Sequence, residues 1–147
     1  ADPTAGEISS EHNQKFSAQY IKEIISRLQD KNFIYILHNC GTKVPFMVPS
    51  LLSTGARALH VGNKVDVLDI LAKVPENIPV FGNLDPTNVF RFGSPELIRS
   101  EVAKLLARTK DYRNFVLSSG CDIPPGTPPE NIHAFFSALR EFNENRN

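Results

Sequence analysis

The first third of the chain passes from a helical pattern to a strand pattern. Within residues 9–31, which Ser9 or Ser10 can cap, apolar side chains recur at every fourth position between polar ones. These apolar residues are Phe16, Tyr20, Ile24 and Leu28. The spacing predicts one half-buried helix. The dense apolar and aromatic run Phe33–Leu37 follows, and such a run is typical of a strand buried on both faces.

The same cycle repeats three more times. Short apolar runs predict three further strands, at residues 56–61, 78–81 and 115–117. Helical spacing and helix-ending residues predict helices at residues 46–54, 65–74 and 94–109. We expect a last helix to begin with a capping box at Thr127–Glu130. Its buried face is predicted to carry Ile132, Phe135, Phe136 and Leu139.

Strands that alternate with helices imply a parallel sheet, so the predicted fold class is α/β with the order α(βα)₄. Two architectures fit this order: an open doubly wound sheet, or four units of a (β/α)₈ TIM barrel. A complete barrel needs about 250 residues. A chain of 147 residues therefore supplies half of one. At this length we expect residues 1–147 to form a single domain.

Composition narrows the classes of function. Sixteen basic and 16 acidic side chains give a formal charge of zero, which argues against a nucleic-acid partner. No run of about 18 apolar residues occurs, so no membrane-spanning helix is expected. The opening residues lack the basic stretch and apolar core of a signal peptide, and two cysteines are too few for a disulfide scaffold. These features favour a cytoplasmic protein.

Side chains suited to chemistry gather at the predicted strand ends, where ligands bind in α/β proteins. The four ends carry His38 with Cys40, His60, Asn83 with Asp85, and Cys121 with Asp122. Both cysteines of the chain are among them. Random placement would seldom put both cysteines directly after a strand, so the pattern indicates a site.

His38 and Cys40 are two residues apart, so both side chains point to one side of an extended strand end. Cys121 can supply a third ligand if the fourth strand end faces the first. Two sulfurs and one nitrogen suit Zn²⁺, and three protein ligands leave the fourth tetrahedral position open for a substrate. The alternative is a hydrogen-bonded histidine beside two inert thiols.

The segment Gly82–Pro86 also has two interpretations. All of its polar residue types form turns, so Asp85 can bond to nearby backbone N–H groups. Alternatively, the backbone approaches a ligand here and offers the amide of Asn83 or the carboxylate of Asp85. His60 is expected as a polar group at the rim of the pocket. Together with Asn83 it is the candidate for substrate binding.

These motifs resemble those of the uroporphyrinogen decarboxylase superfamily. The matching stretches are Leu37–Gly41, Gly82–Pro86 and Ser119–Pro128, with Glu130–Ile132 behind the last. Order and spacing hold from about residue 2 to residue 142. The resemblance implies a (β/α)₈ barrel, of which this chain is the C-terminal half. It also favours a catalytic role for Asp85 near the mouth of the site over a turn role.

The superfamily has two chemistries. Its decarboxylases act on uroporphyrinogen without a metal, through an N-terminal arginine-rich motif and an early-strand aspartate that lie in the half absent here. They also carry a Gly-His pair where this chain has Gly120-Cys121. Its cobalamin-dependent methyltransferases, which act on thiols such as coenzyme M, bind zinc through His-x-Cys and a distant Cys. His38, Cys40 and Cys121 match that pattern.

The methyltransferase branch implies zinc as the cofactor, a corrinoid carried by a partner protein as the methyl donor, and a small thiol as the acceptor. The alternatives are tetrapyrrole decarboxylation, as in porphyrin biosynthesis, and a non-catalytic fragment that binds a corrinoid or tetrapyrrole. A half barrel also leaves its outer strands and apolar faces without partners. We therefore expect the chain to associate with a second copy, unless it is a piece of a longer protein.

Overall fold

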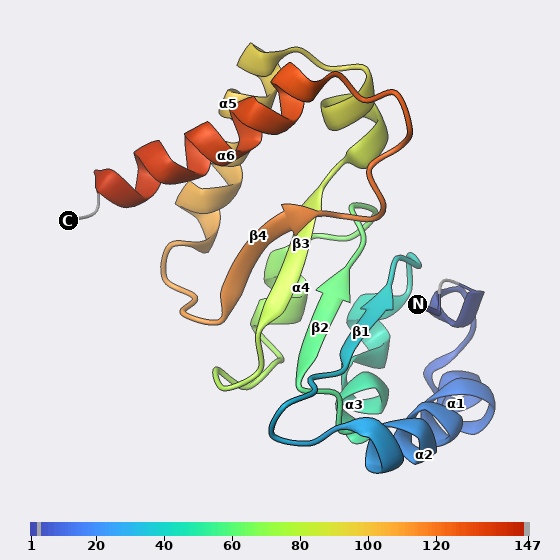
Figure 1. Cartoon of the computed structure of the whole chain (residues 1–147). Helices are drawn as coiled ribbons and strands as arrows, with labels where there is room; N and C mark the ends of the chain where they lie inside the picture. Colours follow the sequence, from blue (N-terminus) through green and yellow to red (C-terminus); the bar gives the residue numbers. More distant parts are fainter. Residues whose placement is uncertain (3, 146–147) are drawn as a thin grey trace.

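Four parallel strands form one sheet in the order β1-β2-β3-β4 in the computed structural model, which describes residues 1–2 and 4–145 (Figure 1). The strands are β1 (Ile36–Asn39), β2 (Ala58–Val61), β3 (Val80–Leu84) and β4 (Phe115–Ser119). Each strand pairs in parallel with the next along the chain. The predicted α/β class with the order α(βα)₄ is confirmed, and the arrangement is that of half a (β/α)₈ barrel.

Helices connect the strands and precede the first one. The N-terminal part holds a 3₁₀ turn (Thr4–Gly6), α1 (Ser10–Asn13), a π-helical segment (Gln14–Ala18) and α2 (Gln19–Leu28). The later helices are α3 (Val44–Ser53), α4 (Val67–Leu71), α5 (Pro95–Thr109) and α6 (Pro129–Glu144). A π-helical turn, Pro86–Arg91, follows β3 where the sequence indicated only a turn. Within the described residues, no helix combines the length and the apolar character needed to cross a bilayer.

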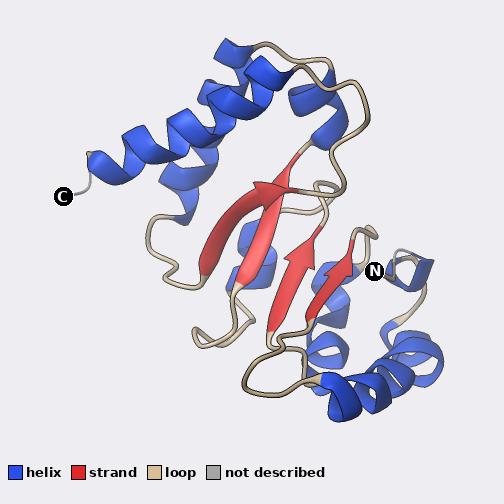
Figure 2. Cartoon of the chain, in the orientation of Figure 1, coloured by secondary structure: helices blue, strands red, loops and turns tan. Residues whose placement is uncertain are grey.

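The hydrophobic core lies between the sheet and these helices. Leu59, Val61 and Val80 are fully buried and belong to one cluster with Met47 of α3 and Ile70 of α4. Figure 2 shows α3 and α4 behind the strands and none of the described helices in front of them. The front face is therefore bare, and it is the face that lines the interior when such a sheet closes into a barrel.

The first strand differs from the prediction at residues 33–37. It begins at Ile36, and only its alternate residues Leu37 and Asn39 are buried. Phe33, Ile34 and Ile36 are about half exposed. A strand buried on both faces needs cover on both faces. Here the helices cover one face only, so the apolar run is buried on one side.

The buried face of the first helical region also differs from the predicted face. The four residues expected to be buried are exposed by 46–60% of their surface: Phe16, Tyr20, Ile24 and Leu28. Ser17, Ala18 and Ile25 are buried instead. Ser17 and Ile25 lie one position after Phe16 and Ile24, which rotates the buried stripe by about 100° around the helix axis. The apolar face of this helical region is wider than the part that packs. Its exposed part lies beside β1, where the backbone nitrogen of Asp2 donates to the carbonyl of His38 at 3.0 Å.

The last helix begins later than expected. Its N-cap is Pro128, and no side chain caps it; the hydroxyl of Thr127 donates instead to the carbonyl of Pro124 at 2.8 Å. The capping box is therefore not formed. Phe135 is buried against Phe90, with ring centroids 5.2 Å apart, but Phe136 is 53% exposed.

Candidate metal centre

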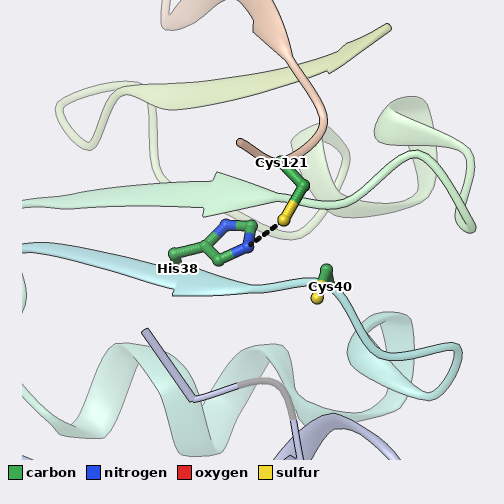
Figure 3. Close-up of side chains that lie close together, drawn as sticks. All are labelled: His38, Cys40 and Cys121. Atoms are coloured by element: carbon green, nitrogen blue, oxygen red, sulfur yellow. Dashed lines mark hydrogen bonds between the residues drawn. The ribbon is translucent and has the colours of Figure 1, made fainter. Parts of the chain in front are cut away.

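Three side chains from the two outer strands of the sheet, β1 and β4, and the residues that follow them meet at the carboxyl ends of the strands. His38 lies in β1, Cys40 follows that strand directly, and Cys121 follows β4. One ligand atom from each lies within 4.8 Å of the others. The thiol of Cys121 points at the imidazole of His38, with Sγ 3.6 Å from Nε2 (Figure 3). The structure thus brings together the three residues that the sequence nominated as zinc ligands.

Two glycines allow the strand ends to approach this closely. A Cβ added to Gly62, after β2, would lie 2.5 Å from the Cβ of Cys40. A Cβ added to Gly120, just before Cys121, would lie 2.5 Å from the backbone nitrogen of Asn63. Carbon and nitrogen atoms cannot approach that closely, so a side chain at either position would push a cysteine-bearing segment out of place.

The imidazole of His38 is held in one orientation. Its Nδ1 lies 3.2 Å from the carbonyl oxygen of His60. A carbonyl only accepts hydrogen bonds, so Nδ1 carries the proton and Nε2 presents its lone pair to the two thiols. Burial, and then the neighbouring His60, lower the pKa of His38. Both effects favour the neutral ring that binds a metal.

The thiols are free and partly buried. Burial raises the pKa of Cys40, and the adjacent thiol of Cys121 raises it further. Reactive cysteine nucleophiles have the opposite character, with a pKa lowered by a nearby positive charge. Cys40 is therefore poorly suited to act as a bare thiolate and well suited to be deprotonated by a bound cation.

The separation of Cys121 and His38 matches that of two ligands on a tetrahedral metal ion. With Zn–S and Zn–N bonds of about 2.3 and 2.05 Å, tetrahedral ligands place sulfur and nitrogen about 3.6 Å apart. The separation of Cys121 Sγ and His38 Nε2 is 3.6 Å. Soft sulfur donors with one imidazole select zinc over magnesium or calcium, which take oxygen ligands. Three protein ligands leave one tetrahedral position for another molecule.

The cluster opens into a small cavity between the strand ends. Besides the three clustered side chains, the cavity is lined by Ala1, His60 and Asp122. His60, a candidate for substrate binding, therefore borders the same space. Its ring lies beside that of His38, with centroids 4.4 Å apart. No lysine or arginine of the described chain lines this cavity.

The structure does not bring Asn83 or Asp85 to the cluster. Both line a different cavity, on the side of α5. The side-chain nitrogen of Asn83 donates to the carbonyls of Gly62 and Val65, at 2.9 and 2.7 Å, and so holds the loop after β2. We therefore correct the expectation that these side chains point at the mouth.

Asp85 adopts the turn role that its residue type allowed. Its carboxylate accepts hydrogen bonds from the backbone nitrogens of Thr87 and Asn88, each at 2.8 Å, and caps the helical turn that follows. A further bond comes from the side-chain nitrogen of Asn88 at 2.8 Å. Burial raises the pKa of Asp85, but these hydrogen bonds outweigh burial and hold the pKa below its usual value.

The backbone contacts around the cluster had no signal in the sequence. Every residue has a backbone carbonyl, so nothing in the sequence marks the carbonyl of His60 as the one that holds the ring of His38. Gly62 and Gly120 offered a signal, because each directly follows a strand, and such a glycine often marks a close approach of another backbone.

Fold and site together define a class: half of a parallel α/β barrel with a His-Cys-Cys cluster at the carboxyl ends of its strands. The sequence model of uroporphyrinogen decarboxylase (URO-D) matches residues 1–142. The chain therefore belongs to the uroporphyrinogen decarboxylase family.

Relatives and a solved structure agree with this membership. A uroporphyrinogen decarboxylase of Prochlorococcus marinus (strain NATL1A) is 30% identical over 97% of this chain, and one of Synechococcus sp. (strain CC9605) is 33% identical over 93%. The chain spans only 40% and 38% of these two proteins. A methyltransferase from Methanosarcina mazei has the same fold, with a TM-score of 0.76 at 24% identity over 96% of this chain and 40% of that one.

Proposed function

We propose that this chain is part of a zinc-dependent methyltransferase that moves a methyl group from a corrinoid, carried by a partner protein, to a small thiol. The observation that carries the proposal is the cluster of His38, Cys40 and Cys121. Two thiols and an oriented imidazole within 4.8 Å of one another form a zinc site with an open position. Zinc bound there would supply Lewis acidity, which lowers the pKa of a thiol substrate to near neutrality.

Residues of this chain would also orient the metal ligands, lower the local dielectric and line the space for the thiol substrate. His38 presents Nε2 because the carbonyl of His60 holds Nδ1. Partial burial of the cluster lowers the local dielectric and strengthens the attraction between a cation and the thiolates. The thiol substrate would enter the cavity beside His60 and Asp122. A site of two unpaired thiols persists under reducing conditions, so the proposal places the protein in the cytoplasm.

A second candidate is decarboxylation of uroporphyrinogen, which is favoured by the names of the curated relatives. Its substrate carries several carboxylates, which cationic side chains would bind. The cavity beside the cluster has no such side chain among the described residues. This candidate therefore depends on groups from the 60% of the relatives' length that lies outside this chain.

The test measures both reactions in a protein that contains this chain at the length of its relatives. We expect methyl transfer from a methylated corrinoid protein to coenzyme M, lost after treatment with a zinc chelator and restored by zinc. Uroporphyrinogen conversion that is insensitive to the chelator would overturn the proposal in favour of decarboxylation. If neither reaction occurs but a corrinoid or tetrapyrrole binds, the chain belongs to a non-catalytic binding protein.

A further inference from the structure

His60 makes two separate contacts to the candidate metal centre. Its backbone carbonyl accepts the hydrogen bond from Nδ1 of His38 at 3.2 Å. Its side chain points towards β4, where its Nε2 lies 2.7 Å from the carbonyl oxygen of Ser119. His60 therefore touches both halves of the site: the strand that carries His38 and Cys40, and the turn that carries Cys121.

The second contact crosses the sheet. His60 lies in β2 and Ser119 in β4, with β3 between them. The carbonyl of Ser119 cannot donate, so Nε2 of His60 carries the proton and donates it. The hydroxyl of Ser119 in turn donates to the carbonyl of Cys121 at 2.7 Å. Two hydrogen bonds, joined through Ser119, thus connect the ring of His60 to the backbone of Cys121.

A backbone hydrogen bond holds the start of the turn that carries Cys121. The backbone nitrogen of Gly120 donates to the carbonyl of Leu84 at 2.6 Å, which fixes the end of β4 against β3. That bond fixes the strand end. Cys121, the residue after Gly120, is oriented by the hydrogen bond from the hydroxyl of Ser119. Ser119 is in turn held by the ring of His60.

We infer that His60 is a positioning residue, whose side chain places the thiol of Cys121 at the distance from His38 that a tetrahedral metal requires. The inference rests on the proposed zinc site and assigns His60 a role other than binding substrate. Groups that orient metal ligands through hydrogen bonds typically change metal affinity by about 10- to 100-fold when they are removed. The ring of His60 also packs beside that of His38, with an angle of 39° between the ring planes, so the two effects converge on the same centre.

The test uses amide side chains that imitate one ring nitrogen at a time. The terminal nitrogen of glutamine lies where Nε2 of histidine lies, whereas that of asparagine corresponds to Nδ1. His60→Gln therefore keeps a donor for the carbonyl of Ser119, and His60→Asn does not. All variants keep the backbone carbonyl that holds His38, so the experiment isolates the contact of the side chain.

We expect zinc affinity, measured by competition with a chromogenic chelator, to fall about tenfold or more in His60→Ala and His60→Asn. His60→Gln should stay within about threefold of the unaltered protein, since it restores the one hydrogen bond in question. Cobalt in place of zinc gives a second readout. The sulfur-to-cobalt charge-transfer band should weaken in His60→Asn, as Cys121 is held less well, and recover in His60→Gln.

Ser119→Ala removes the second of the two hydrogen bonds, the one from the hydroxyl of Ser119 to the carbonyl of Cys121. Because both variants release the same turn, the loss in the double variant His60→Asn with Ser119→Ala should be smaller than the product of the two single losses. Equal zinc affinity in His60→Asn and His60→Gln would overturn the inference, as would unchanged affinity in both. Failure of the unaltered protein to bind zinc would overturn the proposed function itself, so the two failures are distinguishable.

Discussion

Cys121 and His38 are 83 positions apart in the sequence, yet the Sγ of one lies 3.6 Å from the Nε2 of the other. The parallel sheet produces this contact. Every strand ends at the same edge of the sheet, so residues near the carboxyl ends of β1 and β4 converge if the sheet curves. A disulfide is not formed: both cysteines are free thiols. Their convergence with a correctly oriented imidazole is the basis of the first prediction.

We predict that the protein binds one zinc ion and that Cys40→Ser and Cys121→Ser each lose most of it. A serine oxygen is a much poorer zinc ligand than a thiolate, so each variant leaves only two strong donors. Metal content is measured by emission spectroscopy after gel filtration. His133→Ala is the matched control, because His133 is an exposed histidine of α6 that does not line the cavity at the cluster. Equal zinc in all variants would show that the cluster does not hold the metal.

Gly62 provides a steric test of the same site. In Gly62→Ala the new methyl carbon would lie 2.5 Å from the Cβ of Cys40, so Cys40 must move. We expect zinc affinity to fall by about tenfold or more, the scale typical of displaced ligand supports. Gly93→Ala is the control: its Cβ would lie 2.2 Å from the carbonyl oxygen of Val89, away from the cluster. It should destabilise the fold and leave zinc affinity intact. Parallel losses of affinity would refute a local effect.

Much of this site was predictable from spacing. A strand places alternate residues on one side, which put His38 beside Cys40, and parallel topology put Cys121 at the same edge. The structure agrees with both steps. The same logic failed for Asp85, which follows β3 as directly as Cys40 follows β1, because a helical turn begins at the next residue. There the local competition for backbone N–H groups decides the orientation of a carboxylate.

Burial was harder to predict than the order of elements. Periodicity identifies an apolar face, but it does not say how much of that face another element covers. Phe16, Tyr20 and Ile24 belong to such a face and stay exposed, while Ala18 and Ile25 on the adjoining stripe are buried. Which apolar side chains are buried depends on the elements that pack against them. In a whole barrel many of these elements belong to the part of the relatives' length that this chain, which spans 40% of it, does not contain.

Asp85 is predicted to contribute to stability and not to zinc binding. Asp85→Ala removes the acceptor for the nitrogens of Thr87 and Asn88 and should lower the free energy of unfolding by about 1 kcal/mol, the usual effect of losing an N-cap. Asp85→Asn keeps an acceptor and should cost less. Zinc content should be unchanged in both. A loss of zinc in Asp85→Asn at normal stability would return Asp85 to the site.

The pH dependence of stability gives an independent check on Asp85. Hydrogen bonds hold the pKa of its carboxyl below the usual value in the folded protein. The stabilisation is therefore complete above the pKa of the unfolded state and is lost as the pH falls through the lowered folded pKa. Asparagine does not titrate. The difference in unfolding free energy between the unaltered protein and Asp85→Asn should thus shrink on acidification, measured by urea titrations from neutral to acidic pH. A constant difference would contradict the assignment.

The last prediction concerns the apolar surface beside β1. Phe16, Tyr20 and Ile24 line a groove with Tyr35 and Leu37 beside β1, which itself has no charged residue or proline; Asp2 also lines this groove, and its backbone nitrogen donates to the carbonyl of His38 at 3.0 Å.

Exposed apolar edges of this kind invite pairing with another chain. A second copy related by a two-fold axis along the strands would set β4 of one chain parallel to β1 of the other and continue the order of the sheet. We therefore expect the isolated 147-residue chain to show at least twice the monomer mass by light scattering.

Ile24→Glu should shift the chain towards monomer, because it places a charge in the groove that the partner must desolvate. Phe92→Glu is the matched control: Phe92 is 73% exposed but does not line the groove. A monomer with no dye-detectable apolar surface would refute the prediction. An oligomer that both variants disrupt equally would show that general surface charge, and not the groove beside β1, governs the association.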